Sequence, residues 1–297
     1  MKSAGHPAAT RTVSLDLAAG ELRALVEAAI REDLGCGDLT TRLVVPGNRR
    51  ARGALVSQQE IVVAGLPVAA EVFRVLDAET CFDASVDDGA EVRAGTELAM
   101  VAGSAATLLA GERVALNFLQ HLSGIATFTR RMQMHLAGLQ TELLDTRKTT
   151  PGLRALEKYA VRAGGGHNHR QRLDDGILIK SNHLRLAGGV RAAVESARRE
   201  RPPEAANLPI EVEVSTLAEL DEAIAAGAEV LLLDNMTPRE VRSCVERAAG
   251  RVRLEVSGGV NAGNIRAYAE TGVDAISVGA LTHSAPAVDV HFLIEPL

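Results

Sequence analysis

The amino-acid sequence predicts an α/β fold in which the second half of the chain forms an incomplete parallel α/β barrel. About six short apolar segments recur there, and segments with helical periodicity separate them. Such alternation is typical of parallel strands joined by right-handed helical crossovers. A complete barrel of this kind has eight strands, so about six indicate an incomplete one. The predicted strands are 141–144, 177–179, 210–214, 230–233, 253–256 and 275–278, and the clearest helices are 217–226 and 238–249.

The first half of the chain predicts a separate layer that mixes helices and strands. Leu22, Val26 and Ile30 repeat at helical spacing, and Gly35 ends that helix. The residues before it, about the first dozen, are expected to be loosely held. The expected elements are a helix within 15–34, strands within 52–63, a helix at 66–76 with Pro67 in its first turn, and short strands with turns at 87–103.

Residues 107–122 return to a helical period, with Leu108, Val114 and Phe118 at helical intervals. Ser123 is a favourable N-cap residue, so a second helix is expected to start there. Arg113 and Asn117 lie one turn apart on the first of these helices. A helical arginine is more often a solvated surface residue than a ligand, so the spacing alone leaves the role of Arg113 open.

Composition favours a globular protein of 297 residues with 46% hydrophobic content, which is enough for a buried core. The formal net charge of −6 argues against a broadly basic nucleic-acid-binding surface. Cys36, Cys81 and Cys244 are far apart, which argues against a disulfide framework and a structural zinc site. The sequence lacks an apolar signal core and any apolar run of about 18 residues. We therefore expect a cytoplasmic protein that does not bind or span a membrane.

A dense group of basic side chains follows two of the predicted strands. Arg147 and Lys148 come after strand 141–144, Lys180 comes after strand 177–179, and Arg170 lies between them. The carboxyl ends of parallel strands are the usual position of an active site in an α/β barrel. The alternative is a solvated basic face, but the position of these charges at strand ends favours an anion-binding pocket.

Two acids, Glu213 and Asp234, lie at the ends of strands among these basic residues. A buried carboxylate without a partner is unfavourable, so each acid could simply neutralise a nearby lysine. The functional alternative is that both hold a magnesium ion on a pyrophosphate or stabilise a cationic transition state. Spacing alone leaves both interpretations open.

Glycine-containing turns after the last two strands predict a phosphate site. Ser257, Gly258 and Gly259 follow strand 253–256, and Asn261 is expected to cap a helix at 262–270. Backbone amides at such a helix start bind phosphate well. A second turn after the last strand would complete the site, and it comprises Val278, Gly279 and Ala280.

His167 and His169 form a pair that could suggest a metal site. No thiolate or third imidazole lies at metal-ligand spacing from them, so a metal site is not favoured. His169 is expected instead to donate a hydrogen bond to an anionic ligand.

These motifs together resemble the motif series of quinolinate phosphoribosyltransferase, a family also called carboxylating nicotinate-nucleotide pyrophosphorylase. The resemblance runs in order from about Glu32 to His283. Its motifs are Glu112-Arg113, Asp145-Thr-Arg-Lys-Thr149, Gly164-Gly-Gly-His-Asn-His-Arg170, Ile179-Lys-Ser-Asn-His183, Glu211-Val-Glu213, Leu233-Asp-Asn235, Ser257-Gly-Gly259 and Val278-Gly-Ala-Leu-Thr-His283. The resemblance implies an N-terminal α/β sandwich domain of residues 1–124, joined by the tail 282–297, and a barrel domain of residues 125–281. It also implies a homodimer in which one subunit's N-terminal domain covers the other's barrel, and it leaves higher assembly open.

The same resemblance implies a glycosyltransferase (pentosyltransferase) of de novo NAD biosynthesis. The reaction joins quinolinate to phosphoribosyl pyrophosphate, with Mg²⁺, and yields nicotinate mononucleotide, carbon dioxide and pyrophosphate. By resemblance, quinolinate binds the partner subunit's Arg113 together with Thr146, Arg147, His169, Arg170 and Lys180. Lys148, Glu213 and Asp234 act in catalysis on the phosphoribosyl donor, the two acids with its magnesium. The turns at 257–259 and 278–280 bind the 5′-phosphate.

One segment departs from the family pattern. This chain has Gln171-Arg-Leu-Asp-Asp175 where the family usually has a turn that contains glycine. Arginine does not readily adopt the positive φ that glycine allows, so the turn geometry and the affinity for substrate are open there. Two other functions also stay open. A related enzyme for another aromatic acid would be expected to lack some carboxylate-binding groups, and a non-catalytic phosphate-binding protein would not need both acids and Lys180.

Overall fold

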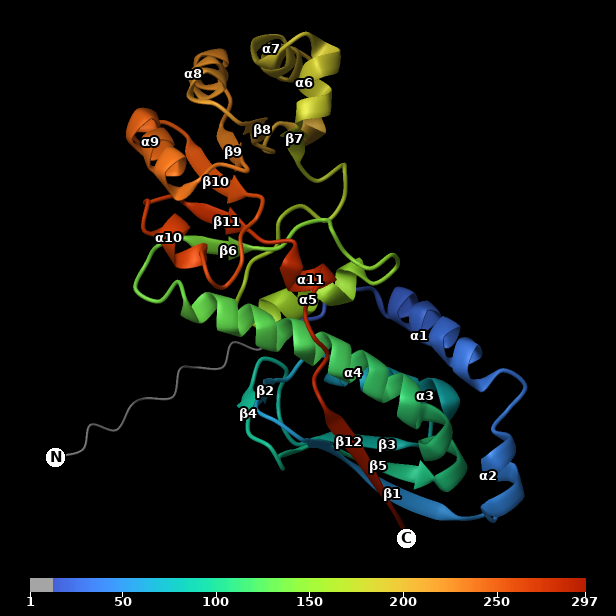
Figure 1. Ribbon diagram of the computed structural model, residues 1–297. Helices are drawn as coiled ribbons and strands as arrows, with labels where there is room; N and C mark the ends of the chain where they lie inside the picture. The colour runs from blue at the N-terminus through green and yellow to red at the C-terminus, as the bar shows by residue number, and fades with distance from the viewer. Residues whose placement is uncertain (1–12) are drawn as a thin grey trace, which may run out of the picture. The chain divides into compact units, whose positions relative to one another are not determined.

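The computed structural model describes residues 13–297, and the predicted loose residues 1–12 lie outside this range (Figure 1). The chain divides into two compact units. The N-terminal unit comprises the chain up to Arg130 with residues 150–165 and 285–297, and the barrel unit comprises residues 131–149 and 166–284. The predicted domain boundary after residue 124 stays a prediction.

The N-terminal unit contains an antiparallel sheet in the order β12-β1-β5-β3. The last strand of the chain, β12, pairs with β1 over its whole length, so the C-terminal tail is part of this sheet. Leu55, Leu98 and Leu119 are fully buried in the core of this unit. Its strands are β1 (Arg50–Ser57), β2 (Ile61–Val62), β3 (Cys81–Ala84), β4 (Glu91–Val92), β5 (Glu97–Ser104) and β12 (Val290–Pro296), and its shorter helices are α1 (Ala19–Leu34), α2 (Leu39–Val44), α3 (Leu66–Leu76) and α5 (Arg154–Ala163).

The expectation of a new helix at Ser123 is wrong. One continuous helix, α4, runs for 30 residues from Ala105 to Met134. Ser123 is buried within it, and its hydroxyl accepts a hydrogen bond from the Ala64 amide (3.0 Å) and donates one to the Ala64 carbonyl (3.1 Å). The hydroxyl satisfies a neighbouring backbone segment, and a local sequence pattern cannot distinguish this role from capping.

The barrel unit contains a parallel sheet of six strands in the order β6-β11-β10-β9-β8-β7. β6 and β7 are its two edges, so the sheet is an incomplete barrel, as the sequence predicts. The strands are β6 (Glu142–Leu144), β7 (Ile177–Ile179), β8 (Ile210–Val214), β9 (Val230–Asp234), β10 (Arg253–Ser257) and β11 (Ala275–Ser277).

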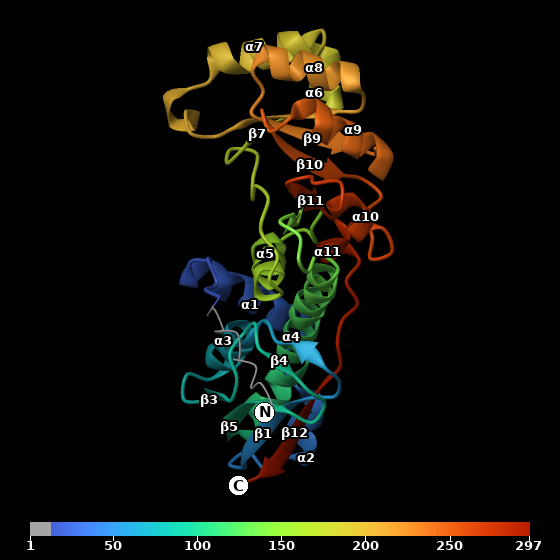
Figure 2. The ribbon, with the colours of Figure 1, turned by 90° about the vertical axis from the view of Figure 1, so that its left-hand side faces the viewer.

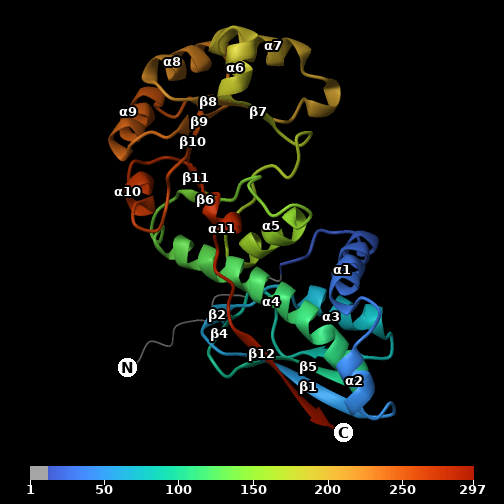
Figure 3. The same cartoon turned by 45° about the vertical axis from the view of Figure 1, so that its right-hand side comes forward.

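Helices cover the outer side of this curved sheet (Figures 2 and 3). Thr216 and Thr237 begin two of them by accepting hydrogen bonds from backbone amides three residues later. Val212, Leu231 and Val256 are fully buried, which is typical of parallel strands covered on both faces. The helices of the barrel unit are α6 (Ser181–Ala187), α7 (Val190–Glu200), the 3-10 helix η1 (Pro203–Ala205), α8 (Leu217–Ala226), α9 (Pro238–Ala248), α10 (Ile265–Ala269) and α11 (Ala280–His283).

The helix predicted at 262–270 is shorter, because α10 begins at Ile265. Asn261 does not cap it. The Asn261 side-chain oxygen accepts from the Gly263 amide (2.9 Å), and the Asn264 side-chain oxygen accepts from the Asn261 amide (2.8 Å). The two asparagines stabilise a polar turn before the helix. In the part of the chain described, no helix, α4 included, combines the length and apolar character needed to span a membrane.

Candidate active site

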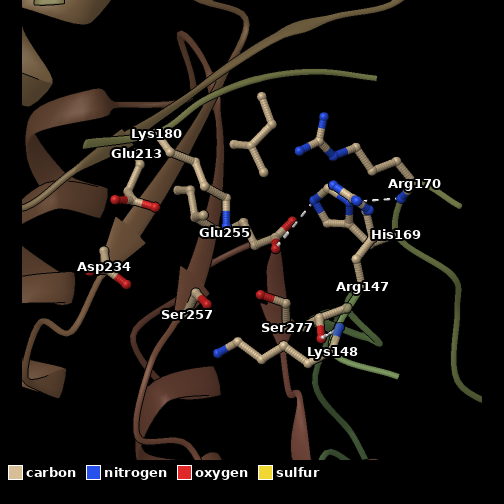
Figure 4. A pocket seen from close by; sticks show the side chains of 13 residues that line it. Arg147, Lys148, His169, Arg170, Lys180, Glu213, Asp234, Glu255, Ser257 and Ser277 are labelled. Carbon is tan, nitrogen blue, oxygen red and sulfur yellow. Dashed lines mark hydrogen bonds and ion pairs between the residues drawn. The ribbon is translucent and has the colours of Figure 1, made fainter. Parts of the chain in front are cut away.

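A pocket of about 340 Å³ opens at the carboxyl ends of the barrel strands, inside the barrel unit (Figure 4). All six strands contribute to it, either with their last residues or with the segment that follows. Its lining contains Thr146, Arg147, Lys148, His169, Arg170, Leu178, Lys180, Glu213, Leu232, Asp234, Glu255, Ser257 and Ser277. The barrel therefore brings together most of the residues that the sequence predicts for the site.

The basic side of the pocket contains two guanidinium groups near each other. Burial, followed by the charge of Arg147, lowers the pKa of Arg170. Arg170 also donates a hydrogen bond from its guanidinium to the Gly176 carbonyl oxygen (2.9 Å), which fixes its direction. An arginine keeps its charge in a protein, so this part of the pocket favours an anion with more than one negative charge.

Asp145 holds the segment that carries His169. Its carboxylate is fully buried and accepts hydrogen bonds from the His169 amide (2.9 Å) and the Asn168 side chain (2.5 Å). Backbone bonds reinforce the link, because the Asp145 amide donates to the His167 carbonyl (3.1 Å) and the His167 amide donates to the Leu143 carbonyl (2.8 Å). Asp145 thus acts through its neighbours, a role that the sequence motif alone did not reveal.

His169 presents its two ring nitrogens to different partners. Nδ1 accepts a hydrogen bond from the Arg170 amide (2.7 Å), so a proton of the neutral ring lies on Nε2. Nε2 lies 3.2 Å from the carboxylate of Glu211 and 3.8 Å from that of Glu255. Donation by His169 to an anionic ligand stays a prediction, because Nε2 faces these acids here.

Glu211 and Glu255 are site residues that the reasoning from strand ends missed. They lie inside β8 and β10 and are only 8% and 3% exposed. Burial, followed by the charge of Glu211, raises the pKa of Glu255 to about 7, whereas His169 acts in the opposite direction. The available signal was an acid with an apolar residue on each side inside a buried strand, which is unfavourable unless the acid has a specific environment.

Glu213 and Asp234 point into the pocket from the ends of β8 and β9 (Figure 4). Glu213 accepts a hydrogen bond from the Ser181 amide (3.1 Å), and Asp234 accepts one from the Asn235 side chain (2.8 Å). Among the described residues neither acid forms an ion pair with a lysine, which disfavours simple neutralisation. Carboxylate oxygens are suitable ligands for Mg²⁺, and two of them hold that ion only together with substrate oxygens or water.

The glycine turn after β10 requires glycine. Gly258 has φ of +94°, and a Cβ atom there would lie 2.3 Å from the side-chain oxygen of Asn235. Ser257, which precedes it, lines the pocket, whereas Gly258 and Gly259 lie in the turn beyond. After β11, a Cβ on Gly279 would lie 3.0 Å from the Lys148 side chain, so this second turn approaches the same pocket. Neither Val278 nor Ala280 is among the pocket's lining residues.

The unusual segment 171–175 closes its turn without glycine. The Asp175 carboxylate accepts hydrogen bonds from the Gln171 amide (2.7 Å) and the Arg172 amide (3.1 Å). Arg172 pairs with Asp174 at 3.0 Å on the surface. Within the described residues, positive φ outside glycine occurs only at Asn235 and Ala249, so Arg172 is not strained. An aspartate side chain therefore replaces the conformational freedom of glycine here.

Arg113 does not line this pocket. It lies on α4 in the N-terminal unit, where it borders a different hollow with Glu112, Leu116 and residues 289–293 of the tail. The pocket of the barrel unit therefore contains every predicted quinolinate ligand except this one.

Comparison with known proteins decides the family. Residues 38–123 match the model of the quinolinate phosphoribosyl transferase N-terminal domain, and residues 125–293 match that of its C-terminal domain. The chain belongs to the quinolinate phosphoribosyltransferase family. The resemblance expected from the sequence motifs is thereby confirmed, as is the class of enzyme, a phosphoribosyltransferase of NAD biosynthesis.

Relatives of the chain match it over nearly its whole length. A probable carboxylating nicotinate-nucleotide pyrophosphorylase of Bacillus subtilis is 42% identical over 270 residues, which are 91% of this chain and 92% of that protein. The carboxylating nicotinate-nucleotide pyrophosphorylase of Mycobacterium leprae is 42% identical over 276 residues, with 90% and 95% covered. The crystal structure of NadC from Streptococcus pyogenes matches with a TM-score of 0.90 at 39% identity, covering 96% of this chain and 100% of that one.

Proposed function

We propose that this chain transfers the phosphoribosyl group of phosphoribosyl pyrophosphate to the ring nitrogen of quinolinate and releases carbon dioxide and pyrophosphate, leaving nicotinate mononucleotide. The observation that carries the proposal is one pocket with two chemically distinct sides. Arg147, Arg170 and Lys180 supply positive charge, and Glu213 and Asp234 supply carboxylates. A dianionic acceptor and a developing ribosyl cation need such opposite environments.

The basic side suits quinolinate, which carries two adjacent carboxylates. Bidentate pairing of Arg147 and Arg170 with these groups is the strong form of arginine recognition. Lys180, whose side chain reaches into the pocket from the end of β7, adds a compact positive charge (Figure 4). The Thr146 hydroxyl accepts a hydrogen bond from the Lys148 amide (3.0 Å). This bond stabilises the turn that carries Arg147 and Lys148.

The acidic side suits the phosphoribosyl donor. Glu213 and Asp234 line the pocket. In this proposal they stabilise positive charge on the ribose as the bond to pyrophosphate breaks. These two acids would also hold magnesium. When bound, this ion would neutralise negative charge on the pyrophosphate. Lys148 would bind the departing pyrophosphate, and the turns at 257–259 and 278–280 would hold the 5′-phosphate through backbone amides.

The proposal includes a homodimer in which the partner subunit's Arg113 completes the quinolinate site, and a cytoplasmic location. The support for shared sites is that Arg113 belongs to the N-terminal unit, whereas the other proposed quinolinate ligands belong to the barrel unit. A cation on a rigid helix is a suitable ligand for the neighbour's substrate.

Incubation of the purified chain with quinolinate, phosphoribosyl pyrophosphate and Mg²⁺ tests the function. We expect nicotinate mononucleotide, pyrophosphate and carbon dioxide in equal amounts by chromatography and isotope counting. Omission of Mg²⁺ should abolish all three products. Absence of pyrophosphate release with quinolinate, but release with another aromatic acid, would assign the chain to a different acceptor.

A further inference from the structure

Two buried glutamates, Glu211 in β8 and Glu255 in β10, have no role in the binding scheme above. One carboxylate oxygen each from Glu211 and Glu255 and one nitrogen of His169 all lie within 4.8 Å of one another. Glu255 is 3% exposed, and its Oε1 has no hydrogen-bond partner among the described residues. Of the two acids, Glu255 lines the pocket and Glu211 does not.

This arrangement favours a proton on Glu255. The Nε2 nitrogen of His169 lies closer to Glu211 (3.2 Å) than to Glu255 (3.8 Å). Its single hydrogen therefore interacts with Glu211. Two buried carboxylates this close cannot both ionise readily, and one of them keeps its proton. The raised pKa of Glu255, about 7, agrees with this geometry.

The other elements around Glu255 do not supply a charge that cancels this effect. β9 contributes the apolar Leu232 at the same level of the sheet, and β11 contributes the hydroxyl of Ser277. Lys180 extends from the end of β7 toward Glu255 in Figure 4, but these two described residues form no ion pair. Ser277 and Arg253 lower the pKa of Glu255 less than burial and Glu211 raise it.

The proposed reaction, on which this inference rests, needs one proton after phosphoribosyl transfer. When carbon dioxide leaves, the electrons of the broken bond stay on C2 of the ring, beside the cationic ring nitrogen. The product has hydrogen at C2, so an acid must supply it. We infer that Glu255 is the acid that protonates C2 during the decarboxylation step.

In this step the O–H bond of Glu255 breaks as the C2–H bond forms, and Glu255 becomes a carboxylate. Solvent returns the proton before the next turnover. Pyrophosphate departs earlier and requires no proton from Glu255. The rates of the two halves of the reaction can therefore be measured independently, because one half releases pyrophosphate and the other releases carbon dioxide.

Single-turnover reactions with quinolinate labelled in the 2-carboxyl group test the inference, with pyrophosphate and labelled carbon dioxide measured in the same samples. Glu255→Gln keeps the size of the side chain and removes its acidic proton. We expect pyrophosphate release to stay near the wild-type rate and carbon dioxide release to slow by roughly 100-fold or more. The carboxylated mononucleotide should accumulate. Glu255→Asp, which restores an acid, should recover part of the decarboxylation rate.

The pH dependence gives a second measurement on the intact wild-type chain. Its decarboxylation rate should fall as pH rises through about 7, because Glu255 loses its proton there. Glu255→Gln should lack this decrease. Glu211→Gln is the matched control in the same cluster. Removal of its negative charge should move the decrease to lower pH without uncoupling carbon dioxide from pyrophosphate.

Three results would overturn the inference. The first is an equal slowing of both products in Glu255→Gln, which would indicate a structural role, and the second is undiminished decarboxylation. If Glu255→Gln does not fold, a wild-type decarboxylation rate that is constant from about pH 6 to about pH 8 would overturn it as well. A wild-type chain that releases no pyrophosphate from quinolinate would instead contradict the proposed function.

Discussion

The backbone amide of His169 donates a 2.9 Å hydrogen bond to the carboxylate of Asp145, which is fully buried at the end of β6. This bond joins two segments that α5 separates in the chain, and the position of His169 in the pocket depends on it. Asp145→Asn should disturb it, because the new amide places a donor beside the donor of Asn168. We expect KM for quinolinate to rise by roughly 5-fold to 150-fold, the equivalent of one buried polar mismatch.

Steady-state kinetics with quinolinate as the varied substrate checks this prediction. Asp174→Asn is the control, because it removes an exposed carboxylate whose ion pair with Arg172 contributes little. Equal effects of the two substitutions would show that Asp145 has no specific positioning role.

Acceptor choice should depend on Arg170. Nicotinate lacks one of the two carboxylates of quinolinate, so it should leave part of the cationic cluster unpaired and react far more slowly. Arg170→Lys keeps the charge but loses the planar bidentate contact, so it should lower kcat/KM for quinolinate by at least about tenfold. The ratio of kcat/KM for quinolinate to kcat/KM for nicotinate should decrease as well. Comparable kcat/KM values for both acceptors in the wild-type chain would argue against this recognition.

The acids Glu213 and Asp234 should act through their charge. Glu213→Gln and Asp234→Asn keep side-chain size, so the fold should persist by circular dichroism while kcat falls by roughly two orders of magnitude or more. Glu246→Gln makes the same change at an exposed position of α9 and should have full activity. Wild-type kcat with unchanged magnesium dependence in both site variants would remove the acids from the mechanism.

The turn at Gly258 should be intolerant of any side chain. Gly258→Ala would place a Cβ 2.3 Å from the Asn235 side chain at φ of +94°, so we expect a higher KM for phosphoribosyl pyrophosphate. Gly95→Ala is a matched control, because its φ of +82° gives similar backbone strain and no atom lies within 4 Å of the added Cβ. Measured melting temperatures separate loss of stability from loss of affinity. Equal KM values for the donor in both variants would show that the turn does not bind it.

Shared active sites predict complementation between two inactive chains. Arg113→Ala and Lys148→Ala should each lose activity, whereas a mixed dimer would contain one site with both lesions and one with neither. With random exchange of equal amounts, recovery should approach roughly a quarter of wild-type activity. Mass spectrometry verifies the exchange. Verified mixed dimers without recovered activity would place Arg113 at its own barrel or outside the site.

The sequence alone was sufficient for the barrel strands, because each is a short apolar segment whose pattern is local. It was also sufficient for the charged residues at strand ends, since chain order fixes which residue follows a strand. Lys148, Lys180, Glu213 and Asp234 were found in this way, and all line the pocket. The family was also identified from the sequence alone, because its motifs occur in the family's order along the chain.

Only the tertiary structure decided which groups meet across elements. Ser123 has the local character of an N-cap, but its hydroxyl bonds to the Ala64 backbone inside a continuous helix. Glu211 and Glu255 are on strands separated by β9, and the fold brings both carboxylates near His169. A raised pKa arises from burial and from neighbours distant in the chain, so local sequence can indicate an unusual acid at Glu255 but not its raised pKa. Periodicity is a property of a segment, whereas the chemistry of this pocket is a property of distances between segments.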